Sequence, residues 1–170
     1  MMRSGGICLT VNIRNMDYKD INEVQRIAKV SWNATYEGII PLEVQNNFLK
    51  LAYNDEQMKL RLEHSVIYVA EVGGQVVGFA NYSPVRDDGK VELAAIYLYP
   101  DFQGLGIGTT LLKRAVTELG GLKEIYINVE KDNTIGMNFY KAKGFKIVEE
   151  FDDDFDGHML KTVRMVLKVK

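Results

Sequence analysis

The 170-residue sequence has few of the residues that form cross-links or bind metal ions. Cys8 is the only cysteine, so the chain cannot form an internal disulfide, as is typical of proteins from a reducing compartment. The two histidines, His64 and His158, are far apart and have no cysteine neighbours, so we expect no metal site.

Long apolar runs and an excess of basic charge are also missing. No apolar run approaches the roughly 20 residues of a membrane-spanning helix, and residues 1–11 lack the apolar core of a signal peptide. A net charge of −2 does not favour nucleic acid or an anionic membrane as a partner. The sequence predicts one cytoplasmic globular domain over residues 1–170, and a homodimer is compatible with it.

Hydrophobic periodicity predicts strands and helices in a mixed α/β order. Strands are expected at 9–14, 66–72, 75–82, 91–99, 123–129, 145–151 and 159–169. Helices are expected after Asp17, after Pro41, after Asp55, after the glycine-rich stretch described next, and over 133–142. Gly73 and Gly74 are typical of the two-residue turn of a hairpin.

The most informative stretch is Gln103-Gly104-Leu105-Gly106-Ile107-Gly108, between a strand and a helix. The first N–H groups of a helix have no internal partner, and alternating glycines let a diphosphate approach the main chain. The stretch therefore predicts a phosphate site, although glycines used for packing alone are an alternative. It is not a Walker loop, and Thr109 stands where a dinucleotide fingerprint has its third glycine.

The residues around this stretch resemble those of a known family. Residues 103–108 are similar to the Gln/Arg-x-x-Gly-x-Gly/Ala signature of the GNAT superfamily of N-acetyltransferases, and residues 96–100 resemble the strand and proline before it. Asn133, Phe139-Tyr140 and Gly144-Phe145 resemble a later block of the family. Residues 32–38, with Pro41, are similar to the substrate-side helices of small bacterial members, and the polyamine acetyltransferases are the nearest likeness.

The resemblance implies a mostly antiparallel sheet of about seven strands, splayed between the fourth and fifth, with flanking helices. It implies acetyl-CoA as cosubstrate, with no metal, and a bulge near Leu98 that produces the splay. The cofactor-binding residues that it implies are Ile96, Tyr97, Leu98, Gln103, Gly104, Leu105, Gly106, Ile107, Gly108 and Asn133. The first three would pair with the pantetheine arm, and residues 103–108 would hold the pyrophosphate.

Two side chains are candidates for the proton transfers of an acetyl transfer. By resemblance, Tyr140 would protonate the leaving thiolate, and it shares a helix face with Asn133; an ordinary core tyrosine is the alternative. Glu92 is the candidate base, and its spacing from Ile96 predicts that both lie on one strand face; a structural glutamate is equally compatible. The N–H group of Leu98 would stabilise the oxyanion.

These features predict an N-acetyltransferase that acts on a primary amine by direct attack in a ternary complex. The acceptor is expected to be a small molecule, such as a polyamine or another small cationic amine. The acidic residues at 152–156 could attract it, or could form an ordinary solvated loop. The alternatives are a protein N-terminal or lysine acetyltransferase, a catalytically weak acyl-CoA-binding regulatory module on the same fold, and a nucleotide-binding protein of another fold.

Overall fold

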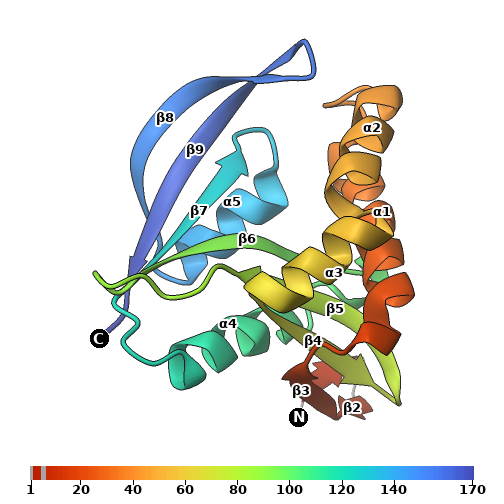
Figure 1. The fold of residues 1–170 in the computed structure, drawn as a ribbon, viewed down its shortest axis with the longest axis vertical. Helices are drawn as coiled ribbons and strands as arrows, with labels where there is room; N and C mark the ends of the chain where they lie inside the picture. Colours follow the sequence, from red (N-terminus) through yellow and green to blue (C-terminus); the bar gives the residue numbers. More distant parts are fainter. Residues whose placement is uncertain (1, 5–6) are drawn as a thin grey trace.

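The computed structural model describes residues 2–4 and 7–170, with side chains described from Leu9 onward. Helices cover both faces of a central sheet, and a long hairpin extends beyond it toward α2 (Figure 1). The elements are β1 (Met2–Ser4), β2 (Ile7–Leu9), β3 (Val11–Asn15), η1 (Tyr18–Asp20), α1 (Ile21–Tyr36), α2 (Leu42–Tyr53), α3 (Asp55–His64), β4 (Val66–Val72), β5 (Gln75–Tyr82), β6 (Lys90–Leu98), η2 (Pro100–Phe102), α4 (Ile107–Glu118), β7 (Glu124–Glu130), α5 (Thr134–Ala142), β8 (Lys146–Phe155) and β9 (His158–Lys168).

The central sheet has seven strands in the order β3-β4-β5-β6-β7-β9-β8. Every neighbouring pair in it is antiparallel except β6 and β7, which run parallel. A separate two-stranded sheet joins β1 to β2. The predicted mixed α/β class and the mostly antiparallel seven-stranded sheet are confirmed.

The sheet opens between β6 and β7, its fourth and fifth strands. Their pairing covers only residues 90–92 against 124–126, and beyond these residues the two strands separate. The predicted splay is therefore confirmed, and it leaves one edge of the later part of β6 without a neighbouring strand.

A bulge interrupts β6 at Ala94. Tyr82 pairs with Leu93, and the next residue back along β5, Asn81, pairs with Ala95, so Ala94 is an extra residue on β6. The bulge therefore lies four residues before Leu98, and the expectation of a bulge near Leu98 was wrong in its position.

Two apolar clusters cover the two faces of the sheet. The cluster on the side of α4 and α5 includes Val91, Leu93, Leu111, Ile125 and Tyr140. The cluster on the side of α1, α2 and α3 includes Val24, Ile27, Met58, Phe79 and Ala95. Each helix packs its apolar stripe on one face, so helices lie on both sides of the opening between β6 and β7.

The bulge reverses which face of the sheet each residue of β6 occupies. Leu93 belongs to the α4–α5 cluster and Ala95 to the α1–α3 cluster, although residues two apart share a face in a regular strand. Glu92, before the bulge, therefore lies on the α1 side, whereas Ile96, after it, packs on the α4 side. The prediction that Glu92 and Ile96 share a face was wrong, because the extra residue shifts the alternation by one.

Candidate active site

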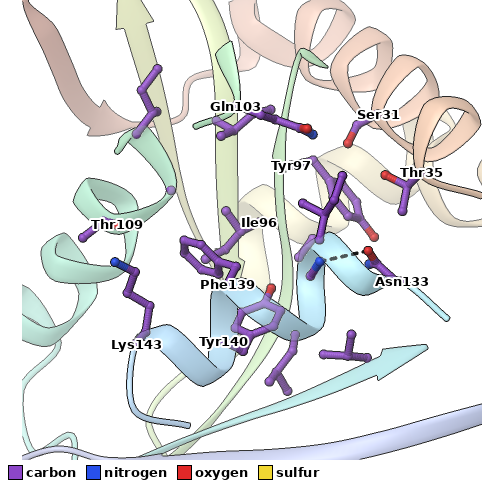
Figure 2. Close-up of a pocket in the computed structure, with 18 of the residues that line it drawn as sticks. Ser31, Thr35, Ile96, Tyr97, Gln103, Thr109, Asn133, Phe139, Tyr140 and Lys143 are labelled. Carbon is purple, nitrogen blue, oxygen red and sulfur yellow. Dashed lines mark hydrogen bonds between the residues drawn. The ribbon is translucent and has the colours of Figure 1, made fainter. Parts of the chain in front are cut away.

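A cavity of about 420 Å³ lies where β6 and β7 separate (Figure 2). It is closed by the start of α4 on one side, by α5 below, and by α1 on the opposite face of the sheet. The predicted site residues that line it are Ile96, Tyr97, Leu98, Gln103, Gly104, Gly106, Ile107, Gly108, Asn133 and Tyr140. Leu105 does not line the cavity, and its side chain packs against the apolar core instead.

The glycine-rich loop presents main-chain N–H groups to this cavity. Gly104 and Gly106 have φ values of 75° and 84°, in the left-handed region that favours glycine. Gly106 is the N-cap of α4, and no side chain within residues 9–170 caps that helix. The first backbone hydrogen bond of α4 is the one that the N–H of Thr110 donates to the carbonyl of Gly106 at 3.1 Å. The amides before Thr110 are therefore oriented to bind an anion.

The contact between α4 and α5 depends on Gly108. A Cβ atom at this position would lie 3.1 Å from Cε1 of Phe139, closer than ordinary contact. The glycine therefore lets the start of α4 lie against α5 and narrows that end of the cavity.

Lys143, after the last residue of α5, also lines the cavity and was missed by the sequence reasoning. Figure 2 shows its side chain extending toward Thr109 at the start of α4. A lysine there adds positive charge beside the loop amides. The sequence showed a lysine at a helix end, but only the packing of α5 on α4 brings it to this loop.

The open edge of β6 carries backbone groups without strand partners on that side. Residues 96–98 pair with β5, and the N–H of Tyr99 donates to Val77 on β5 at 3.0 Å. Since hydrogen-bonding directions alternate along a strand, the N–H and C=O groups of Ile96 and Leu98 point into the opening. An extended ligand with amide groups could pair with this edge as an additional strand.

Tyr140 and Asn133 enter the cavity from α5. Tyr140 is 7% exposed between Phe139 and Phe145, and its hydroxyl points into the cavity (Figure 2). Burial first, and then nearby Tyr97 and Tyr82, raise the pKa of Tyr140, so its phenol stays protonated at neutral pH. Asn133 caps α5, where its Oδ1 accepts the N–H of Gly136 at 2.9 Å.

The opposite wall of the cavity comes from α1. Ser31, Thr35 and Tyr36 line it, and burial followed by the proximity of Tyr97 raises the pKa of Tyr36. Trp32 lies behind this wall: it stacks on Phe48 at 4.4 Å between ring centroids and donates its Nε1–H to the Tyr97 hydroxyl at 2.8 Å.

Glu92 does not line the cavity. Its carboxylate pairs with the guanidinium of Arg164 on β9, with Nη1 3.3 Å from Oε2. Nη1 of Arg164 also donates to Asn128 at 3.0 Å, and the guanidinium lies 4.6 Å from the ring centroid of Tyr126. These contacts favour the alternative expectation, a structural glutamate that joins β6 to β9.

The part of the chain that the structure describes contains no group of three or more His, Cys, Asp or Glu side chains that could hold a metal ion. None of its helices is both long and apolar enough to span a membrane.

Comparison with known proteins identifies the family to which this splayed sheet and glycine loop belong. Residues 25–145 match the model of the Acetyltransferase (GNAT) family, so the chain belongs to that family. The predicted resemblance and the predicted class of enzyme, an N-acetyltransferase, are confirmed.

Among curated relatives, a spermidine N(1)-acetyltransferase of Thermoplasma acidophilum is 26% identical over 155 residues, which cover 86% of this chain and 95% of the relative. An uncharacterized N-acetyltransferase of Bacillus subtilis, YuaI, is 30% identical over 158 residues, covering 90% of each chain. Among solved structures, the PaiA N-acetyltransferase of Thermoplasma acidophilum in complex with coenzyme A superposes with a TM-score of 0.81 at 26% identity, over 94% of this chain and 99% of that one.

Proposed function

We propose that this enzyme transfers the acetyl group of acetyl-CoA to a primary amine of a small cationic acceptor of the polyamine class, such as spermidine. One observation carries the proposal: the open edge of β6 at Ile96 and Leu98 lines the same cavity as the glycine loop and Tyr140. The names of the relatives support the cosubstrate and the kind of acceptor.

The cavity fits the separate parts of acetyl-CoA. The free amides at the start of α4 suit its pyrophosphate, including the backbone of Leu105, and Lys143 adds a cation beside them. The amide groups of the pantetheine arm match the open N–H and C=O groups of Ile96 and the open C=O of Leu98, which leaves the N–H of Leu98 for the thioester oxygen. Asn133, at the start of α5, would contact the arm between these two regions.

The chain supplies groups for each step of a direct attack. The neutral amine attacks the thioester carbonyl carbon and forms the C–N bond, while the N–H of Leu98 stabilises the negative charge on the oxygen. When the C–S bond breaks, the phenol of Tyr140 protonates the thiolate, and the second proton released from nitrogen restores the phenol through solvent. Holding the two substrates together supplies a large part of the rate enhancement.

The hairpin of β8 and β9 supports a slender cationic acceptor. Its tip closes against α1 and α2, since Phe155 lies 5.1 Å from Phe48 between ring centroids and Nε2 of His158 lies 3.2 Å from the carbonyl of Ile39. The same hairpin carries the acidic residues at 152–156, which favour the approach of a cation. A small cationic amine is compatible with these acidic residues.

The test is an acceptor screen at saturating acetyl-CoA with thiol release as the signal. The panel contains putrescine, spermidine, spermine, an aminoglycoside, a peptide with a free N-terminus and a peptide with an internal lysine. We expect the highest kcat/KM for a polyamine, and intersecting double-reciprocal plots because both substrates bind before chemistry. A higher kcat/KM for a peptide would show that the acceptor is a peptide and not a polyamine. If no amine of the panel causes thiol release, the proposed function is contradicted.

A further inference from the structure

Glu130, the last residue of β7, is a buried carboxylate that the proposed chemistry does not yet use. It is 8% exposed, and its Oε2 accepts the N–H of Asp132 at 2.7 Å. Its carbonyl accepts the N–H of Asn133 at 3.0 Å, which ties it to the start of α5. Glu130 is therefore held firmly next to a residue that lines the cavity.

Glu130 lies on the α1 side of the opening, which is the acceptor side if acetyl-CoA occupies the α4 side. Ile125, Ile127 and Val129 of β7 pack in the α4–α5 cluster, so alternation directs Glu130 to the opposite, α1 side. It lies four residues beyond Tyr126, the last residue of β7 that pairs with β6. Glu130 is not itself among the residues that line the cavity, but it stands at the open end of the separated strands, on the face where Tyr36 of α1 lines it.

The carboxylate of Glu130 has no cationic partner among the side chains from Leu9 onward. The two nearest lysines in sequence and register are engaged elsewhere: Lys131 pairs with Glu150 at 2.7 Å, and Lys161 pairs with Asp152 at 2.9 Å. Glu92, the other carboxylate on this face, is already neutralised by Arg164. Burying an unpaired carboxylate is costly, and an ammonium group would compensate for it.

Burial makes Glu130 a better proton acceptor than an exposed glutamate. Burial first, and also the negative charge of Asp132, raise its pKa, while the backbone N–H groups of Asp132 and Asn133 act in the opposite direction. The negative charge of the Glu130 carboxylate contributes to the raised pKa of Tyr36, so this tyrosine of α1 lies near Glu130. From β9 the paired residue is Thr162, which does not titrate.

We infer that Glu130 binds the ammonium group of the acceptor at the acceptor side of the opening and takes its proton before attack. This inference rests on the proposed function and names a residue for it. One proton moves from R–NH₃⁺ to the carboxylate, directly or through one water, and leaves R–NH₂ free to form the C–N bond. Glu130 then releases that proton to solvent, so one proton leaves for each amide formed, in addition to the proton that returns to the thiol.

The test compares Glu130→Gln with wild type. Glutamine keeps an oxygen for the N–H of Asp132, so the loop and α5 are expected to fold, and acetyl-CoA affinity by calorimetry should stay within about twofold. We expect kcat/KM for the amine to fall by about 10²-fold or more. In the wild type, kcat/KM should fall at acidic pH as Glu130 becomes protonated, at a pH above the usual range for a glutamate. In Glu130→Gln this acidic limb should disappear.

Asp132→Asn is the matched control, because it removes an exposed carboxylate from the same loop. Its kcat/KM should stay near that of wild type, with the acidic limb moved slightly to lower pH. Binding of spermidine to the protein saturated with CoA, measured by calorimetry, gives a readout without turnover and should weaken in Glu130→Gln.

The outcomes separate this inference from the proposed function. If Glu130→Gln keeps the turnover and the acidic limb of the wild type, the role of Glu130 is overturned and the proposed function is not affected. A wild type that neither acetylates nor binds any amine would overturn the proposed function and the role of Glu130 together. Loss of both amine binding and turnover only in Glu130→Gln would support the assignment.

Discussion

Tyr140 has the two properties that a proton donor to a thiolate needs. Its hydroxyl reaches into the cavity from α5, and burial keeps the pKa of the phenol above its usual value. A phenol with a raised pKa retains its proton through the neutral range, so that a proton is available beside the sulfur when the C–S bond breaks.

Replacing Tyr140 by Phe should lower kcat by about 10²-fold, because the ring still packs between Phe139 and Phe145 while the donor is lost. Acetyl-CoA affinity should remain within about threefold, measured by calorimetry. An unchanged kcat, measured with the best acceptor of the screen, would remove Tyr140 from the mechanism.

Gly136 is the third residue of α5, and the cap of that helix requires it. A glycine within a helix usually lowers its stability, but this helix starts at Thr134, so Gly136 lies in its first turn. A Cβ atom here would lie 2.6 Å from Nδ2 of Asn133. The glycine thus makes room for the capping side chain.

Gly136→Ala should displace the Asn133 side chain. The lost cap costs about 1 kcal/mol, while alanine gains about 1 kcal/mol in helix propensity, so the midpoint of thermal unfolding should change little. Acetyl-CoA affinity should nevertheless fall severalfold, since Asn133 lines the cavity. Unchanged affinity by calorimetry would show that Asn133 does not contact the cosubstrate.

At the scale of elements, the ends of α4 and α5 form the anion site jointly. The loop amides come from the start of α4, and Lys143 comes from the end of α5. Helix N-termini and lysine attract phosphate by different means, because the amides are fixed dipoles and the lysine is a flexible charge.

Lys143→Gln should weaken acetyl-CoA binding by about 1 kcal/mol or less, roughly fivefold, since a partly exposed charge is screened. The dependence of affinity on salt concentration should also become shallower. Lys141→Gln, in the same turn but not lining the cavity, is the control. Equal losses in both variants would assign the effect to net charge rather than to the site.

The sequence allowed most of the elements and most of the cavity to be predicted, for a physical reason. Strand periodicity and glycine conformational preferences are local, so β4, β5, the glycine loop and the helix that begins near Asn133 follow from short stretches of chain. The bulge at Ala94, the ion pair of Glu92 and the proximity of Lys143 depend on partners distant in sequence. Local spacing could not indicate them, and the face expected for Glu92 was therefore wrong.

At the scale of the molecule, α4 and α5 pack on one face of the sheet and α1 on the other, and all three line one cavity. The acetyl donor is expected on the α4 side and the amine on the α1 side. The two substrates would then approach through the separated strands without crossing each other.

Acetyl-CoA at about 100 times its Kd should stabilise the whole domain by about 2.7 kcal/mol. For a chain of this size the midpoint of thermal unfolding should rise by about 5–10 °C. NAD and ATP at the same concentration should give a much smaller shift, because neither has the pantetheine arm that pairs with β6. Equal shifts for all three ligands would favour a general nucleotide site.

The extra residue at Ala94 gives the two halves of β6 opposite phase. A deletion of that single residue would turn Val91 and Leu93 out of the apolar core and direct Glu92 into it. In a homologous chain without this insertion, the residues equivalent to one half of β6 would occupy the opposite face of the sheet. Comparisons of specificity within the family therefore need to align the two halves of this strand separately.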